Sequence, residues 1–139
     1  MTGPARRDDG NAVIETVLVM PVIIVLICFI VLVGRLTAAR NDISAATKAA
    51  ARAATLQRDA YSADRAAHDA AAASLTRTGI DCATLTITVD TSNFAPGGFV
   101  RVDIACTVSL ADISPLAVPG DKTIAGQAVE VIDQWRGTA

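Results

Sequence analysis

The side chains in this sequence that commonly carry chemistry are one histidine, three cysteines and a scatter of aspartates. His68 has no second histidine and no cysteine at metal-ligand spacing, so we interpret it as a solvated or partly packed residue. No Ser/His/Asp or Cys/His set can be assembled, because the candidate nucleophiles have no positional signature. The sequence therefore predicts a protein that is not an enzyme and has no cofactor, metal or small-molecule substrate.

The three cysteines occupy two environments. Cys28 lies within a long apolar run, whereas Cys82 and Cys106 lie in the polar part of the chain and lack the CxxC spacing of a redox or zinc site. In an oxidising compartment these two can pair, and in a reducing one they would remain separate thiols. We predict a disulfide between Cys82 and Cys106, which would place the C-terminal part of the chain outside the cytoplasm.

The apolar run organises the rest of the chain. No charged residue occurs from Thr16 to Gly34, a helical length of about 28 Å, close to the hydrocarbon thickness of a bilayer. No polar face can be drawn on this helix, as a soluble helix would require. We predict that the run spans a membrane, which leaves residues 35–139 for one small domain.

Composition argues against a nucleic-acid partner. The formal net charge is −2 and aromatic residues make up only 4% of the chain. A nucleic-acid-binding surface would need a basic block for the phosphates or aromatic platforms for the bases, and this sequence has neither.

Two residues in or beside the apolar run need a reason beyond hydropathy. Glu15 stands at its threshold, where an ionised carboxylate needs a partner or a place among lipid headgroups; alternatively it only marks the interface. Pro21 has no backbone N–H and leaves a carbonyl unpaired one turn earlier, so we expect a helix kink there.

Basic residues flank both ends of the run and do not settle its orientation. Arg6 and Arg7 precede it, and Arg35 and Arg40 follow it. A cleavable secretory signal is a rival interpretation, with the small residues around Thr37 and Ala39 as its cleavage site and a mature start near Arg40. The run is longer than the ~7 to 15 apolar residues of such a signal, and a helical pattern continues through the supposed cleavage site.

The residues at the start of the run also carry a resemblance. Gly10 and Asn11, then Glu15, then a Val-Leu-Val-Met segment ending in Pro21, closing on Gly34 and an arginine, resemble the N-terminus of TadE-like proteins. These are pseudopilin-like components of tight-adherence (Flp-type) pilus assembly systems. The resemblance implies that a prepilin peptidase cuts after Gly10, so that Asn11 becomes the N-terminus and Glu15 the fifth mature residue.

The resemblance implies a structural role in assembly of such a pilus or a related secretion system, as a minor pilin or pseudopilin. Its expected partners are the membrane, other pilin or pseudopilin subunits, assembly platform proteins and a prepilin peptidase. We expect residues 1–10 to be a cytoplasmic leader, 11–34 a transmembrane helix and 35–139 an extracytoplasmic stalk and head, anchored in the cytoplasmic membrane or displayed at the cell surface. A secreted small domain and a single-pass accessory protein are the alternatives.

Two helices are expected in the polar part. Residues 35–58 contain no proline or glycine and are rich in alanine, which predicts that the membrane helix continues as a stalk. A second alanine-rich helix is predicted over residues 63–78, with Ser62 as its N-cap and Gly79 as the residue that ends it.

The hydrophobic period then changes from 3.6 to 2. Residues 84–89 and 100–108 alternate strictly, which predicts two antiparallel strands joined by a turn. We expect a register with Val89 opposite Val100 and Thr88 opposite Arg101. Cys82 would then oppose Thr107, so the disulfide would need a bulge or a bend at the start of the first strand.

A third strand is predicted over residues 122–133, after a proline-containing loop at residues 111–121. Its apolar residues are not on one parity, so we expect it to change face or end early, with Gly126 as a candidate bulge. Trp135 is either an exposed tip or an anchor against the sheet. The predicted class is α+β and pilin-like: a long membrane and stalk helix, a second helix and a small three-stranded antiparallel sheet.

Overall fold

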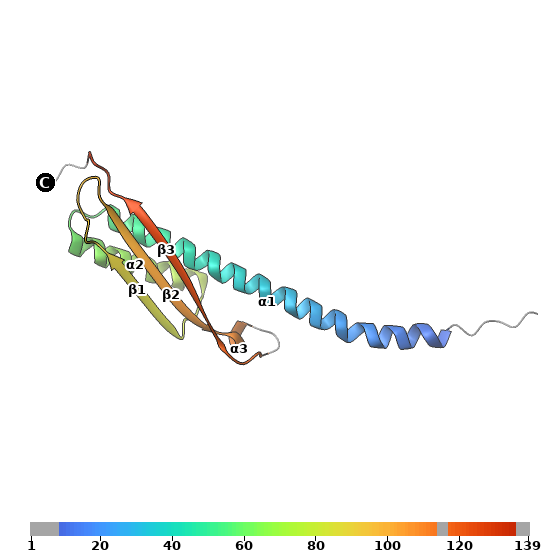
Figure 1. The fold of residues 1–139 in the computed structure, drawn as a ribbon. Helices are drawn as coiled ribbons and strands as arrows, with labels where there is room; N and C mark the ends of the chain where they lie inside the picture. The colour runs from blue at the N-terminus through green and yellow to red at the C-terminus, as the bar shows by residue number, and fades with distance from the viewer. Residues whose placement is uncertain (1–8, 114–116, 136–139) are drawn as a thin grey trace, which may run out of the picture.

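The computed structural model describes residues 9–113 and 117–135. The elements, in chain order, are α1 (Asp9–Thr55), α2 (Ala60–Thr78), β1 (Thr84–Asp90), β2 (Phe99–Ser109), α3 (Leu110–Ile113) and β3 (Asp121–Val131). The N-terminal half of α1 projects alone as a rod, and its C-terminal half lies along the sheet (Figure 1). The predicted α+β class, with a long helix, a second helix and a three-stranded antiparallel sheet, is confirmed.

α1 is one continuous helix of 47 residues that passes through Pro21. The predicted continuation of the apolar run into a stalk is therefore confirmed, although the helix ends slightly before the expected end at Arg58. In its C-terminal half the buried positions are mostly alanine, as at Ala46, Ala50 and Ala54. Alanine favours the helix, and its small side chain allows the second helix to approach closely.

α2 begins earlier than predicted. Its N-cap is Asp59, whose Oδ1 accepts a hydrogen bond from the backbone N–H of Ser62 at 2.8 Å, so the prediction of Ser62 as the cap is wrong. Residue type does not distinguish Asp59 from Ser62 as a cap; in the structure the backbone of Asp59 is extended, whereas Ser62 lies within the helix. The C-terminal prediction is confirmed: Gly79 ends the helix in the left-handed conformation, with φ 69°.

The sheet has the strand order β1-β2-β3, and both pairs are antiparallel. The predicted register of β1 and β2 is wrong by two residues, because Thr88 lies opposite Asp103 and Arg101 lies opposite Asp90. The two N-terminal residues of β2, Phe99 and Val100, pair with β3 instead of β1. A shift of two preserves which side chains share a face, so the alternation of the strands is as predicted.

β3 pairs with β2 in unbroken register, with Ile104 directly opposite Gly126. The predicted bulge at Gly126 is therefore wrong. The mixed parity of the apolar residues has another cause: Ile124 and Ile132 face the helices and are buried, whereas Val131 is on the outer face and is 72% exposed. The glycine serves helix packing, because a Cβ at that position would lie 2.7 Å from Oγ1 of Thr47 in α1.

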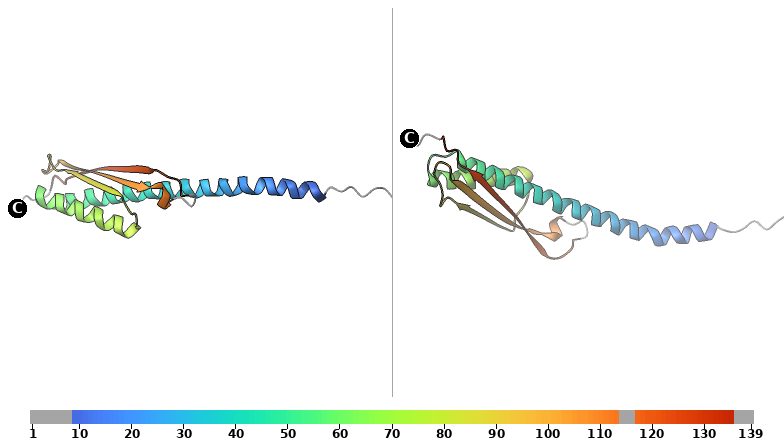
Figure 2. Two further views of the ribbon diagram at one scale, coloured as in Figure 1. Left: turned by 90° about the horizontal axis from the view of Figure 1, so that it is seen from below. Right: turned by 45° about the horizontal axis from the view of Figure 1, so that its top comes forward.

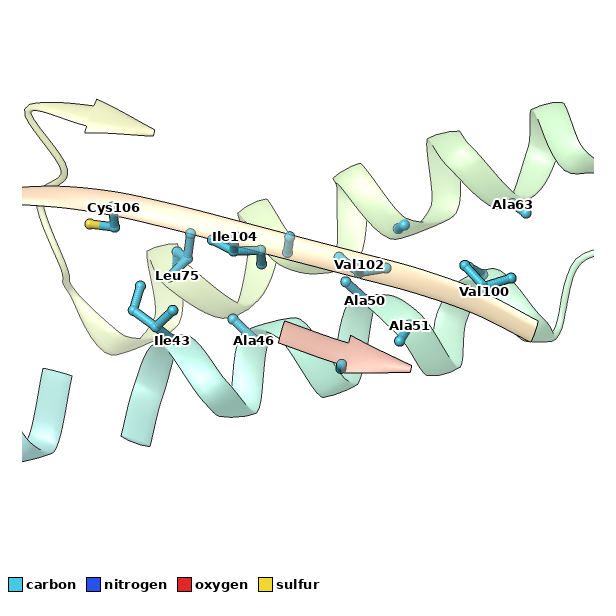
Figure 3. Packing of buried hydrophobic residues seen from close by; sticks show 14 of the residues in the cluster. Ile43, Ala46, Ala50, Ala51, Ala63, Leu75, Val100, Val102, Ile104 and Cys106 are labelled. Carbon is cyan, nitrogen blue, oxygen red and sulfur yellow. The ribbon is translucent and has the colours of Figure 1, made fainter. Parts of the chain in front are cut away.

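The head is built in two layers, with α1 and α2 side by side on one face of the sheet (Figures 1 and 2). The buried side chains of both helices and of β2 point into the space between the layers, as the positions of Ile43, Leu75 and Ile104 illustrate (Figure 3). Among the described residues, no helix lies on the opposite face of the sheet. The hydrophobic core therefore lies within the C-terminal part of the chain, and α1 alone connects it to the apolar run.

The connection from β2 to β3 contains one helical turn, α3, where a loop was predicted. Residues 114–116 of the expected serine-proline loop lie outside the described residues. Near the C-terminal end Trp135 is 89% exposed, so of the two alternatives for this residue the exposed tip is the one observed.

Candidate functional site

The surface with the most pronounced character is the N-terminal half of α1. Its large apolar side chains are exposed on every side of the helix, as shown by Val17 at 66%, Leu18 at 68% and Val22 at 67% exposure. Within the described residues α1 is the one helix long and apolar enough to cross a membrane. Exposed apolar surface on this scale is unfavourable in water and favourable in lipid, so this helix has the character of a single-pass membrane anchor.

Glu15 is an exposed residue near the start of that surface. It lines a shallow hollow on α1 together with Thr16, Val19, Met20 and Ile23. Gly10 and Asn11 lie in the first turns of α1, because the helix already begins at Asp9. The Glu15 carboxylate is thus about one helical turn along α1 from Asn11.

Two further predicted residues lie deeper in the apolar run. Pro21 is within the helix, where its ring removes one backbone hydrogen bond. Cys28 is partly buried and forms no disulfide within the described residues.

The head begins close to the end of the run. From Ile14 onward, where burial is described, Ile43 is the first fully buried residue of α1, and it lies about 14 Å of helix beyond Gly34. Between them, Arg35, Ala38 and Ala39 of α1 line a hollow with the C-terminal end of α2 and with α3. A membrane around the apolar run would therefore have the α3 end of the head near its surface.

Cys82 and Cys106 form a disulfide with a Cα–Cα distance of 5.3 Å, which confirms the predicted pairing. The bend that the pairing required is also present, at Ala83, whose backbone N–H donates to the carbonyl of Thr107 at 2.8 Å. Cys106 is fully buried in β2, and Cys82 lies just after α2. The disulfide therefore fastens the segment between α2 and β1 to the central strand.

His68 lies on α2 with its Nε2 atom 3.9 Å from Oδ1 of Asp64, and both side chains are about half exposed. This agrees with the interpretation of a solvated or partly packed histidine. Among the described residues no three His, Cys, Asp or Glu side chains are placed to hold a metal ion.

Two features were missed from the sequence. One is the contact of Thr47 with Gly126, for which the only signal was a glycine in an otherwise regular strand. The other is the placement of charged residues on the outer side of the sheet and on the exposed side of α1, which depends on how α1 is rotated against the sheet.

The fold and the exposed helix together define a class: a protein with one apolar N-terminal helix that continues into a disulfide-bonded α+β head. Residues 10–52 match the family described as TadE-like protein, so the chain contains a TadE-like domain over that range. The match lies wholly within α1 and includes Gly10, Asn11, Glu15 and Pro21, whereas the disulfide lies outside it. No curated protein and no solved structure matches the chain.

The match of residues 10–52 to TadE-like protein points to an association with tight-adherence pilus systems. Proteins of this family are generally not catalytic.

Proposed function

We propose that this protein is a minor pilin or pseudopilin that supports assembly of a tight-adherence (Flp-type) pilus, acting by subunit packing and not by turnover. The observation that carries the proposal is α1: its exposed apolar half is suited to lipid, its other half is built into the head, and the TadE-like match covers both. The same helix therefore forms the anchor and part of the head. The depth of α1 in the membrane would set the height of the head above the membrane.

The proposed topology has residues 1–10 in the cytoplasm, residues 11–34 in the cytoplasmic membrane and residues 35–139 outside. The disulfide in the head supports this direction, because structural disulfides form and persist in oxidising compartments. The apolar run, which separates residues 1–10 from the head, is long enough to cross a bilayer.

The proposed roles of the N-terminal residues follow from their placement. Gly10 offers no side chain to obstruct a prepilin peptidase at the membrane surface, and cleavage would leave Asn11 as the first residue. Glu15 would then neutralise an N-terminal ammonium, its own or that of a neighbouring subunit, where the low dielectric strengthens the pairing. Such pairing would set the register between subunits, with assembly platform proteins as further partners.

The test is the phenotype of Glu15→Ala in the organism's pilus system. We expect the chain to remain in the membrane fraction at normal levels while piliation falls, because the apolar run is intact and only the charge is lost. Val19→Ala is the matched control, since Val19 lines the same hollow and its replacement removes volume but no charge. Gly10→Val should instead prevent removal of the leader.

The N-terminal sequence of the mature chain separates the alternatives. A start at Asn11 supports the pilin-like subunit. A start near Arg40 would indicate a secreted domain, and a start at Met1 or Thr2, with normal piliation in the Glu15→Ala strain, would indicate a single-pass accessory protein.

A further inference from the structure

Two surfaces of the head are left uncovered by its own elements. The front face is the outer side of the sheet around its centre: Thr86, Thr88, Asp103, Ala105, Ala125 and Gln127. The back ridge is the exposed side of α1 that points away from the sheet: Ala45, Lys48, Ala49 and Arg52. The sheet and the helices form separate layers, so the two surfaces lie on opposite sides of the head (Figure 2).

The front face is hollowed and carries negative charge. Thr86, Ala105 and Ala125 stand side by side across the three strands, and these short side chains form the floor of the hollow. In the next row Asp103 accepts a hydrogen bond from Nε2 of Gln127 at 2.8 Å, which fixes its carboxylate at the surface. Of the described residues that line the hollow, Asp103 is the one with a charged side chain.

The neighbouring row does not alter this charge. Asp90 and Arg101 are directly opposite each other in register, so their charges offset one another. The net charge of the front face is therefore set by Asp103.

The back ridge is narrow and positive. At 100° per residue, Ala45 and Arg52 project from α1 on the side opposite Ile43 and Thr47, which face the sheet. Lys48 lies beside them, and all four ridge residues are exposed. The two alanines leave the backbone of the ridge open to close approach by another surface, with Lys48 and Arg52 supplying the charge.

The two surfaces are also at the same height along α1. Gly126 lies against Ile43 and Thr47, so the centre of β3 is level with that turn of the helix. Ala125 is adjacent to Gly126 on the front face, and Ala45 lies between Ile43 and Thr47 on the back ridge. Asp103 and Lys48 are displaced from this level by no more than about one helical turn.

We propose that copies of this chain stack front to back in the membrane, with the back ridge of one copy docked on the front face of the next and Lys48 facing Asp103. The inference rests on the membrane anchoring in the proposed function, because copies held by the same apolar run in one bilayer have their heads at the same height. Opposite charges at matched height favour the contact. Confinement in a membrane raises the effective concentration of the copies, so that a weak contact between heads is enough to hold them together.

Such a contact is heterologous: each copy offers a different surface on each side, and the stack can grow. A two-fold dimer would instead bring like surfaces together, with Lys48 near Lys48 or Asp103 near Asp103. Cross-linking between differently marked copies distinguishes these arrangements.

The experiment uses the full chain in native membranes, with Cys28→Ala to remove the unpaired thiol. One copy carries Ala45→Cys and the other Ala125→Cys, each with its own tag, and a short bis-maleimide reagent is added. We expect a cross-linked dimer only when both copies are present. Val131→Cys in place of Ala125→Cys is the matched control, because it is exposed on the same face but about 20 Å further along β3.

Charge reversal tests the specific pair. Lys48→Glu in the Ala45→Cys copy should lower the cross-linked fraction by roughly 3- to 10-fold. Asp103→Lys in the Ala125→Cys copy should do the same, and the two together should restore it. Lys122→Glu, an exposed lysine near the start of β3, should leave the yield unchanged.

Equal cross-linking by either cysteine variant alone, equal yield with Val131→Cys, or no rescue by the double reversal would overturn the stacking. A membrane-inserted chain that gives no mixed cross-link would contradict stacking alone. Absence of the unsubstituted chain from the membrane fraction would contradict the proposed function and would remove the basis of this inference with it.

Discussion

Gly126 of β3 lies against Thr47 of α1 with no room for a side chain between them. A Cβ on Gly126 would be 2.7 Å from Oγ1 of Thr47 and 3.0 Å from Cγ2 of Ile43. The Thr47 hydroxyl is held in place, because it donates to the carbonyl of Ile43 at 2.7 Å within α1. Thr47 is also the one buried polar side chain among the described residues. This contact sets the distance between the long helix and the sheet.

Substitution of Gly126 should therefore destabilise the head. We expect Gly126→Ala to lower the free energy of unfolding by about 1 to 3 kcal/mol, because overpacking forces the helix and the strand apart. Thermal unfolding of the full chain in detergent, followed by circular dichroism, measures this. Gly34→Ala is the control, since nothing lies within 4 Å of a Cβ there. A stability equal to that of the unsubstituted chain would mean that the helix and the strand have room for a methyl group between them.

Addition of Thr47→Ala to Gly126→Ala should recover part of the loss. The double variant removes the oxygen atom nearest to the new methyl group, so the two changes should not be additive. Purely additive losses would show that Ile43, and not Thr47, limits the approach.

Removal of the disulfide should lower the stability of the head. The bond joins residues 24 apart in sequence, for which the chain-entropy argument gives about 3 to 4 kcal/mol. Replacement of Cys82 and Cys106 by serine should lower the unfolding temperature, while Cys28→Ser should not. Non-reducing peptide mass spectrometry of chain recovered from membranes should find the linked peptides; two reduced thiols there would contradict an oxidising location.

Stability should also fall in acid through the cap of α2. Hydrogen bonds from the side chain and the backbone of Ser62 lower the pKa of Asp59 below its ordinary value of 3.8. Bonds from Ser92 do the same to the pKa of Asp90. Because the folded pKa values are depressed, this stabilisation is present above the unfolded value and is lost as the pH falls through the folded one.

Asp59→Asn isolates the contribution of the cap. Asparagine caps a helix about as well as aspartate but does not titrate, so this variant should lose less stability than the unsubstituted chain between about pH 5 and pH 2. The measurement is a series of unfolding curves across that range. Parallel pH profiles for the two chains would mean that Asp59 contributes nothing to acid sensitivity.

Orientation can be measured with single cysteines in a background that carries Cys28→Ala and Gly10→Val, the second of which keeps the leader on the chain. A membrane-impermeant maleimide added to intact cells should label Thr37→Cys and leave Thr2→Cys unlabelled until the cells are opened. The physical reason is that the apolar run separates these two positions by one bilayer thickness. The reverse pattern would place the head in the cytoplasm.

The sequence alone was sufficient for those features that depend on local chemistry. Four such features could be predicted: the charge-free run after Glu15, the alanine-rich stalk, the change of hydrophobic period at residue 84, and Gly79 at the end of α2. Each follows from the intrinsic preferences of neighbouring residues. The pairing of Cys82 with Cys106 was also predictable, since they are the two cysteines outside the apolar run.

Tertiary structure decided the features that depend on distant partners. A register shift of two residues keeps every side chain on its face, so alternation could not distinguish Thr88 opposite Arg101 from Thr88 opposite Asp103. The role of Gly126 depends on a helix almost 80 residues earlier, and the matched height of Lys48 and Asp103 depends on how that helix packs. Only the folded chain brings these groups into a fixed relation, because their separation in sequence places no local constraint on it.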